Sequence, residues 1–296
     1  MIFNIQNQFS SASIDSLGAQ LISFQDATGR EYMWQRNPDV WSGCSPILFP
    51  IVGNCRDDKT IIEGESYEIP KHGPIRHTEF HLKEQTESSV TFSITQEDIP
   101  ANMYPYLFEL LVTYTLEEKT LHFSITVHNK DSKSIAYCLG LHPAIHCPLY
   151  PNETFEDYVL RFPEKQLHGY RGYDLEVLQF DMSCEHPFPS HDNTDIPLTH
   201  SLFKKDAIWF DRPTSREVSI INPTTGKGIH ASYPEFETIA FWTKCMKEAT
   251  YVCIEPWNGS AACSDEDNEF LHKNHVQTLE QNASKTYRLD LTILNE

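Results

Sequence analysis

Apolar and polar residues alternate at every second position over several stretches of the chain. Between Leu121 and Val127 the odd-numbered positions are apolar and the even-numbered positions are polar. Alternation of this kind places apolar side chains on one face of a β-strand and polar side chains on the other. The same pattern recurs in three further segments: 90–94, 135–141 and 287–293.

Short turn-rich segments separate these candidate strands, at 26–29, 117–120 and 222–228. No window of comparable length carries an apolar stripe with helical spacing. Antiparallel sheets with one solvated face give this alternation. The pattern therefore predicts an all-β protein, built as a large antiparallel β-sandwich or barrel.

The domain organisation is predicted to be simple. No Gly-, Ser- or Pro-rich linker divides the chain, and no repeat of fixed period is found. Residues 151–199 are the least regular stretch, and we expect long loops and irregular strands there. The prediction is one domain over residues 1–296, with a two-domain split inside 151–199 as the weaker alternative.

Composition narrows the classes of partner. The chain has 296 residues, of which 40% are hydrophobic, so it can bury a substantial core. Its 23 basic and 42 acidic residues give a net charge of −19, which repels nucleic-acid backbones and anionic lipid. We expect a neutral small molecule as partner, and an anionic one only where a local cluster of Lys or Arg overrides this field.

The chain carries no recognisable targeting or nucleotide-binding signal. The first eleven residues lack a basic flank and an apolar run, and no apolar stretch is long enough to cross a bilayer. Glycine-rich phosphate loops are also missing. The eight cysteines form no CxxC pair, which favours free thiols in a reducing compartment. These features predict a cytoplasmic protein without nucleotide chemistry.

Chemically capable residues interrupt the strand pattern at four places. His72 stands beside Gly73, where the backbone can approach a ligand closely. His142 is predicted to end a strand, because the following proline cannot donate to a ladder. Glu255 is predicted at the tip of the apolar strand 252–254, and Asp206 precedes another apolar run. Each feature alone is more often structural than functional.

Metal binding and serine hydrolysis have little support. His142 and His146 are four residues apart, which on a strand separates them by roughly 13 Å, too far to share one ion. No GxSxG motif is present. We therefore expect no metal centre.

Taken in order, a set of motifs is more informative than its members. The segments are GAQLIS (18–23), GREYMWQ (29–35), SPILFPIVG (45–53), HG (72–73) with Arg76, HP (142–143), KDA (205–207) and EPWNG (255–259). This order resembles the aldose 1-epimerase (galactose mutarotase-like) family, in the branch that contains the LacX proteins. The resemblance covers about residues 14–294.

The resemblance implies a large β-sandwich of the galactose mutarotase type, a supersandwich, with a sugar cleft on a concave sheet face. Members of the family interconvert the α and β anomers of aldoses without a cofactor or metal. By motif, Glu255 matches the general base and His142 the general acid. His72 matches a second histidine near the ring oxygen, Asp206 a carboxylate that binds sugar hydroxyls, and Arg76 the basic residue of an HG-x-x-R pattern.

The aromatic residue after Pro256 leaves two readings open. Trp257 could offer its ring face to the apolar side of a sugar, or it could pack in the core.

The chain departs from the branch pattern around the implied pocket, at Pro74, Ala144 and Asn54. Arg56 could supply, from two positions along, the guanidinium that the branch carries at position 54. The departures leave three functions open: a hexose epimerase, a hexose 6-phosphate epimerase that uses Arg56, Arg76 and Lys71, and a non-catalytic sugar-binding protein. In each case the expected partner is a monosaccharide.

Overall fold

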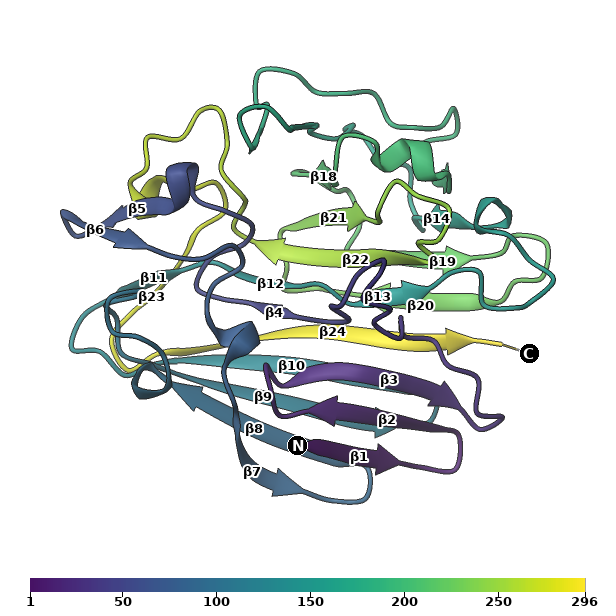
Figure 1. Ribbon diagram of the computed structural model, residues 1–296, viewed down its shortest axis with the longest axis horizontal. Helices are drawn as coiled ribbons and strands as arrows, with labels where there is room; N and C mark the ends of the chain where they lie inside the picture. Colours follow the sequence, from purple (N-terminus) through teal and green to yellow (C-terminus); the bar gives the residue numbers. More distant parts are fainter. Residues whose placement is uncertain (296) are drawn as a thin grey trace.

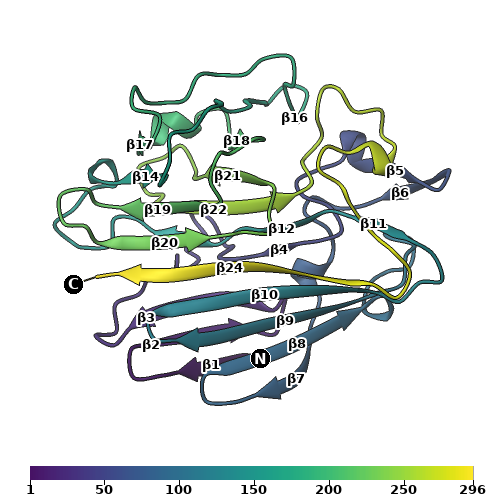
Figure 2. The same cartoon turned by 180° about the vertical axis from the view of Figure 1, so that it is seen from behind.

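The computed structural model describes residues 1–295, and its regular structure is dominated by antiparallel strands. A nine-stranded sheet runs the length of the molecule and is seen most fully in Figure 2. Its strands are, in spatial order, β17 (Asp195–Pro197), β14 (Val159–Arg161), β19 (Glu217–Ile221), β20 (Gly228–Ser232), β24 (Ser284–Leu294), β10 (Thr120–Asn129), β9 (Phe108–Glu117), β8 (Ser89–Thr95) and β7 (His81–Gln85).

Two smaller sheets lie over this large sheet (Figure 1). One has three strands: β1 (Ile2–Gln6), β2 (Ser10–Asp15) and β3 (Gln20–Asp26). The other has β18 (Ile208–Phe210), β21 (Thr238–Trp242), β22 (Tyr251–Asn258), β12 (Leu139–Leu141) and β4 (Ile47–Leu48), with β13 (Ala144–His146) also paired to β22. Aromatic contacts join the layers, as between Phe3 and Phe92, whose ring centroids are 5.2 Å apart.

The remaining elements are short. Three two-stranded pairs are β5 (Lys59–Ile62) with β6 (Glu65–Glu68), β11 (Ile135–Tyr137) with β23 (Gln277–Leu279), and β15 (Tyr173–Asp174) with β16 (Gln179–Phe180). Within residues 1–295 the helical elements are 3₁₀ turns: η1 (Arg56–Asp58), η2 (Ile75–His77), η3 (Gln96–Asp98), η4 (Phe155–Asp157), η5 (His200–Phe203) and η6 (Phe270–His272). No helix in this part of the chain is long and apolar enough to cross a membrane. The prediction of an all-β antiparallel sandwich is confirmed.

The alternating segments form the central strands of the large sheet. β10 pairs with β9 on one side and β24 on the other, and its apolar positions are buried. Tyr114 of β9 and Phe123 of β10 stack with their ring centroids 4.3 Å apart. Burial of each such side chain contributes about 1.5–3 kcal/mol. Alternation predicted these strands well because only one of their faces is packed.

One predicted strand is wrong. Residues 135–141 form two strands in different sheets, β11 and β12, because the chain changes sheet at Cys138. The Cys138 amide leaves the ladder and donates to the Pro50 carbonyl at 2.8 Å. All seven residues are buried, so the apparent alternation did not reflect an exposed face.

Glu255 also lies elsewhere than predicted, in the middle of β22 and not at a strand tip. The neighbour of β22 changes along its length, from β13 at Tyr251–Cys253 to β12 at Trp257–Asn258. In this gap the Ile254 amide donates to the Pro143 carbonyl at 3.0 Å. The backbone nitrogens of alternate residues point to the same edge of a strand, so that of Pro256 points, like that of Ile254, to the edge beside β12 and β13. Because no β-strand within residues 1–295 pairs with Pro256 at this edge, the strand continues through the proline without losing a ladder bond.

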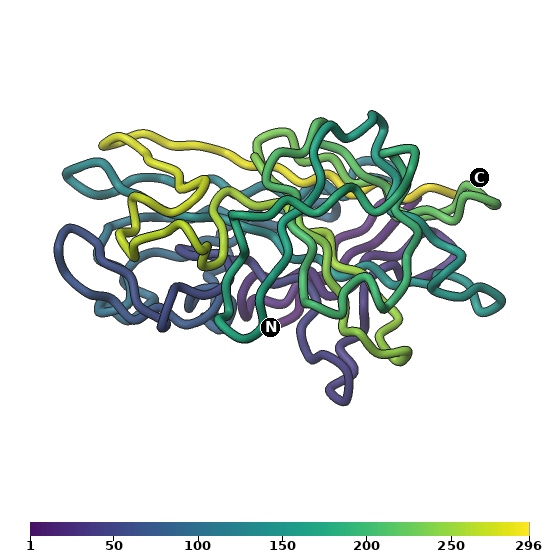
Figure 3. The backbone as a smooth tube through the Cα atoms, turned by 90° about the horizontal axis from the view of Figure 1, so that it is seen from above, coloured from purple at the N-terminus to yellow at the C-terminus, as the bar shows by residue number. Residues whose placement is uncertain are grey.

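The irregular stretch is confirmed as loops and short strands. Between β14 and β18 the chain makes a long excursion that carries β15, β16 and β17, of which β16 and β17 are labelled in Figure 2. Seen from above in Figure 3, its teal and green trace lies over the middle of the molecule. This excursion contributes Tyr173 and Phe180 to the lining of a cavity on the six-stranded sheet. A single domain over residues 1–296 stays a prediction.

Candidate active site

A cavity of about 300 Å³ lies on the six-stranded sheet and is hereafter called the central cavity. Strand residues supply its floor, and loops from distant parts of the chain supply its walls. It is lined by Trp41, Pro46, Gly53, Asn54, Lys71, His72, Arg76, His142, Tyr173, Phe180, Asp206, Ala207, Trp242, Lys244, Glu255, Trp257 and Ala261. The volume suits one small polar ligand.

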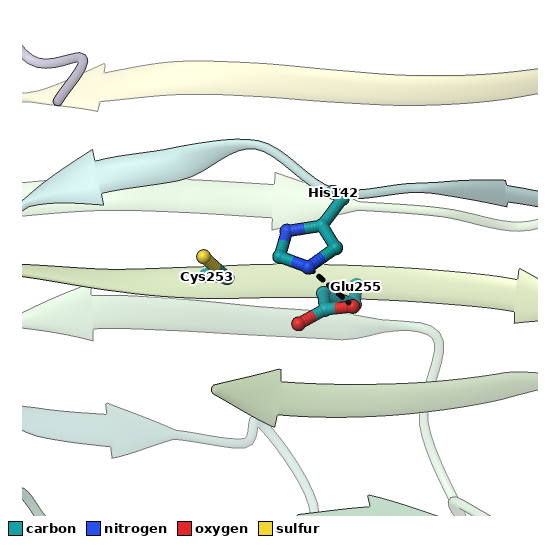
Figure 4. Close-up of side chains that lie close together, drawn as sticks. All are labelled: His142, Cys253 and Glu255. Carbon is teal, nitrogen blue, oxygen red and sulfur yellow. Dashed lines mark ion pairs between the residues drawn. The ribbon is translucent and has the colours of Figure 1, made fainter. Parts of the chain in front are cut away.

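The register of β22 brings His142 and Glu255 together. Along β22, Ala144 of β13 pairs with Cys253, and Gly140 of β12 pairs with Trp257. His142 lies midway between Gly140 and Ala144, and Glu255 lies midway between their partners, Trp257 and Cys253. His142 therefore stands opposite Glu255. Its Nε2 atom is 3.2 Å from Oε2 of Glu255, and the side chains are 9% and 2% exposed (Figure 4).

Burial shifts both members of this pair toward their neutral forms. Desolvation raises the pKa of Glu255 well above its ordinary value, with a further contribution from Asp206 and a partial offset from Lys71. Desolvation lowers the pKa of His142 to about 3, and the positive charges of Lys71 and Arg76 act in the same direction. In this state the one shared proton sits on the carboxyl group, beside a neutral imidazole.

His72 is held at the cavity by its own backbone turn. Its amide donates to the Gly53 carbonyl at 2.6 Å, and its Nδ1 accepts from the Gly53 amide at 3.0 Å. Because Nδ1 accepts, the neutral ring carries its hydrogen on Nε2. Burial lowers the pKa of His72, with a contribution from His142, whose ring centroid is 5.7 Å away. His72 is thus a neutral hydrogen-bond donor beside the pair.

The turn after His72 requires glycine. Gly73 has a φ of +76°, and a Cβ there would lie 1.8 Å from the Phe49 carbonyl oxygen. Gly73→Ala is expected to lower the free energy of unfolding by more than the roughly 1–2 kcal/mol of left-handed strain, because the backbone must also move. Urea unfolding measures the change.

The matched control is Gly64→Ala. Gly64 has a φ of +82°, but a Cβ at this position would meet no atom within 4 Å, so only the backbone strain applies. Equal losses for the two variants would contradict a packing requirement at Gly73.

The other residues of the predicted site divide clearly. Arg76, Asp206 and Trp257 line the central cavity with the histidines and Glu255. Trp257 lines the cavity and also packs in the core, where its ring centroid lies 6.4 Å from that of Trp209, so stacking on a sugar stays a prediction. Arg56 lies outside the lining, and its guanidinium donates to the Cys263 carbonyl at 3.0 Å.

Position 54 is filled differently from the branch pattern. The Asn54 side chain lines the central cavity and donates to the Leu178 carbonyl at 3.0 Å. It also accepts from the Tyr173 hydroxyl at 3.0 Å. Asn54 therefore ties the excursion between β14 and β18 to the cavity wall, while Arg56 is committed elsewhere.

Several residues that line the cavity were not predicted from the sequence. Trp41 and Trp242 flank His142 with ring centroids 5.3 and 5.8 Å away. Tyr173 begins the short strand β15, and Lys244 lies in the loop after β21. None of these positions carries a local signal, because their approach to His142 depends on loop paths and on pairing between strands that are distant in the sequence. The aromatic rings provide flat apolar surfaces beside the polar pair, an arrangement suited to a sugar, which has both polar and apolar faces.

One cluster of candidate metal ligands is present in the described chain: His142, Cys253 and Glu255, whose ligand atoms lie within 4.8 Å of one another. The pair considered in the sequence analysis, His142 with His146, is a different one. His146 does not reach this cluster, since its Nδ1 is 2.8 Å from the Thr250 carbonyl oxygen. Cys253 was missed, although its position two residues before Glu255 on a strand places both side chains on one face.

Comparisons with known proteins cover most or all of the chain. The sequence model described as "Aldose 1-epimerase" matches residues 1–277. The plasmid and chromosomal LacX proteins of Lactococcus lactis subsp. lactis are 35% identical over 301 residues, with 100% of each chain covered.

Solved structures give the same fold. A galactose mutarotase related enzyme from Lactobacillus acidophilus has a TM-score of 0.91 at 28% identity, with 100% of this chain and 98% of that chain covered. A galactose mutarotase-like protein from Lactobacillus casei has a TM-score of 0.90 at 26% identity, with 99% and 100% covered. The predicted galactose mutarotase type of sandwich is confirmed.

Proposed function

Because the chain belongs to the aldose 1-epimerase family, we propose that it interconverts the α and β anomers of a hexose, with His142 and Glu255 as the acid and base. The observation that carries this proposal is the contact between His142 Nε2 and Glu255 Oε2, 3.2 Å apart inside a cavity of about 300 Å³. An acid and a base within one cavity are what ring opening requires.

Anomer exchange needs two proton transfers and no external reactant. The base removes the proton from the anomeric hydroxyl O1, and the acid gives a proton to the ring oxygen O5 as the C1–O5 bond breaks. The open aldehyde rotates about C1–C2, and the reverse transfers close the ring on the other face. Each positioned transfer contributes roughly 10²–10⁴-fold.

The His142–Glu255 pair holds the single proton that this cycle needs. Transfer along the Nε2–Oε2 contact converts the neutral pair into an imidazolium and a carboxylate, with no change in net charge. Glu255 then acts as base toward O1 and His142 as acid toward O5. His72 donates from Nε2 to a sugar oxygen nearby, and Asp206 accepts from sugar hydroxyls.

The direct test is exchange between anomers of fresh α-glucose and α-galactose, followed by polarimetry or NMR. Acceleration by the purified protein supports the proposal. Sugar binding without any acceleration would identify a non-catalytic sugar-binding protein and contradict it.

His142→Asn is expected to lower kcat for mutarotation by about 10²-fold, because the variant loses the acid. The loss falls at the lower end of the range because His72 lies in the same cavity and can supply part of the function. His146→Asn is the control, since His146 bonds the Thr250 carbonyl outside the central cavity. Unchanged kcat in His142→Asn, with normal folding, would remove His142 from the mechanism.

A phosphorylated hexose is a second candidate substrate, favoured by three cations of the central cavity: Lys71, Arg76 and Lys244. Within residues 1–295, none of the salt bridges formed by lysine or arginine involves Lys71, Arg76 or Lys244. Arg76 Nε is buried without a hydrogen-bond partner in this part of the chain. Unpaired cations are notable in a chain with a net charge of −19, and a phosphate would pair with them.

Arg76→Gln is expected to raise KM for glucose 6-phosphate by about tenfold or more, as loss of one charge-assisted hydrogen bond predicts. KM for glucose should change less. Arg56→Gln is the matched control, because Arg56 lies outside the cavity lining. Equal effects of Arg76→Gln on the two sugars would exclude a phosphate contact at Arg76.

A further inference from the structure

Cys253 is a buried neighbour of the proposed catalytic pair that the reaction does not use. It is fully buried and shares a face of β22 with Glu255. Its Sγ atom, one ring nitrogen of His142 and one carboxylate oxygen of Glu255 all lie within 4.8 Å of one another. Figure 4 shows the sulfur beside the imidazole ring.

Two polar atoms of this cluster lack partners. Within residues 1–295, Glu255 Oε1 and His142 Nδ1 are buried and form no hydrogen bond. A buried polar atom left without a partner costs about 1–3 kcal/mol, so such atoms call for an explanation. A cation bound by both carboxylate oxygens would satisfy Oε1.

We propose that His142, Cys253 and Glu255 bind a single Zn²⁺ ion, in competition with the sugar. Thiolate, imidazole and carboxylate are the ligand types that zinc prefers, whereas Mg²⁺ and Ca²⁺ favour oxygen atoms alone. Around a tetrahedral zinc ion, neighbouring ligand atoms are about 3.3–3.6 Å apart. The Nε2–Oε2 distance of 3.2 Å is already close to this spacing. The ligand atoms of the cluster lie within 4.8 Å of one another, so the Cys253 sulfur needs to move closer to the pair when zinc binds.

Charge and access also suit the ion. A thiolate and a carboxylate neutralise its two positive charges. His142 and Glu255 line the central cavity, so the fourth position opens toward it, as in sites with three protein ligands. The imidazole of a zinc ligand usually donates its other nitrogen to an acceptor. His142 Nδ1 has no partner in residues 1–295, so we expect an exchangeable, inhibitory ion.

Zinc binding is tested on the intact chain by titration with ZnCl₂ in a calorimeter, and by titration with CoCl₂ while thiolate-to-cobalt absorption is recorded. We expect saturable one-site binding and a thiolate absorption band in the wild type. Cys253→Ser should weaken zinc binding at least about tenfold, since even loss of a residue that only supports a ligand costs 10–100-fold. Cys147→Ser, at another fully buried cysteine, should bind as the wild type does.

The cobalt spectrum of the wild type keeps the test decisive if Cys253→Ser fails to fold. No zinc binding, no thiolate band, or equal affinity in Cys253→Ser would each overturn the proposal.

The competition with sugar, unlike metal binding, rests on the proposed function. Zinc should inhibit mutarotation by the wild type, and a chelator should restore the rate. Cys253→Ser should lose most of the sensitivity to zinc. Zinc binding to a protein that turns over no sugar would contradict the proposed function alone. Zinc binding that leaves an active wild type uninhibited would contradict the competition.

Discussion

Glu255→Gln is expected to lower kcat for mutarotation by about 10³–10⁴-fold, because the amide can neither hold nor accept the proton that the cycle moves. Gln has nearly the shape of Glu, so the register of β22 and the contact with His142 should persist. Sugar affinity should therefore change little. Saturation transfer between anomers by NMR measures kcat, and calorimetry with the same sugar measures binding.

Glu84→Gln is the control for the charge change, since Glu84 is exposed on β7 and outside the central cavity. It should leave both quantities unchanged. A Glu255→Gln variant that retains more than a tenth of the wild-type kcat would show that another group is the base.

Lys273→Met should have the largest effect on stability. Lys273 and Glu266 form an ion pair of 3.1 Å, and their side chains are only 4% and 8% exposed. Removing one partner of a buried pair leaves an uncompensated charge, which costs about 3–5 kcal/mol. Glu266 is also fixed by the Cys263 and Asn274 amides, at 3.2 and 3.1 Å, so it cannot turn to solvent without losing these bonds. Urea unfolding at neutral pH measures the loss.

An exposed pair provides the comparison. Lys59 and Glu68 are 3.2 Å apart with side chains 54% and 75% exposed, so Lys59→Met should cost about 0–1 kcal/mol. Lys273 lies in the loop between β22 and β23, and the same loop includes Ala261, which lines the central cavity. If Lys273→Met lowers the free energy of unfolding by no more than Lys59→Met does, the buried Lys273–Glu266 pair does not stabilise this loop.

Alternation predicted strands whose two faces differ, and it failed where they do not. β10 and β24 have one packed face each, so period two identified them. All eight residues of β22 are buried, so its sequence carries no alternation and only its apolar start was predicted as a strand. The division of residues 135–141 was unpredictable for the same reason.

Residues of suitable type could be selected from the sequence, but the contact between them could not. The motifs around His142 and Glu255 marked residues of suitable type, and the register of β12, β13 and β22 then placed them in contact. Pairing between distant strands is not encoded in local periodicity. The path of a loop decided the position of Arg56, whose guanidinium turns to the Cys263 carbonyl, and that of Tyr173, which the irregular excursion carries to the cavity.

The most direct measurement is a crystal structure of the wild-type protein with a bound aldose. The account predicts a Glu255 carboxylate oxygen about 2.6–3.2 Å from O1 and His142 Nε2 at a similar distance from O5, with the sugar lying against both side chains in the central cavity. A sugar whose anomeric carbon points away from His142 and Glu255, or one bound outside this cavity, would contradict it.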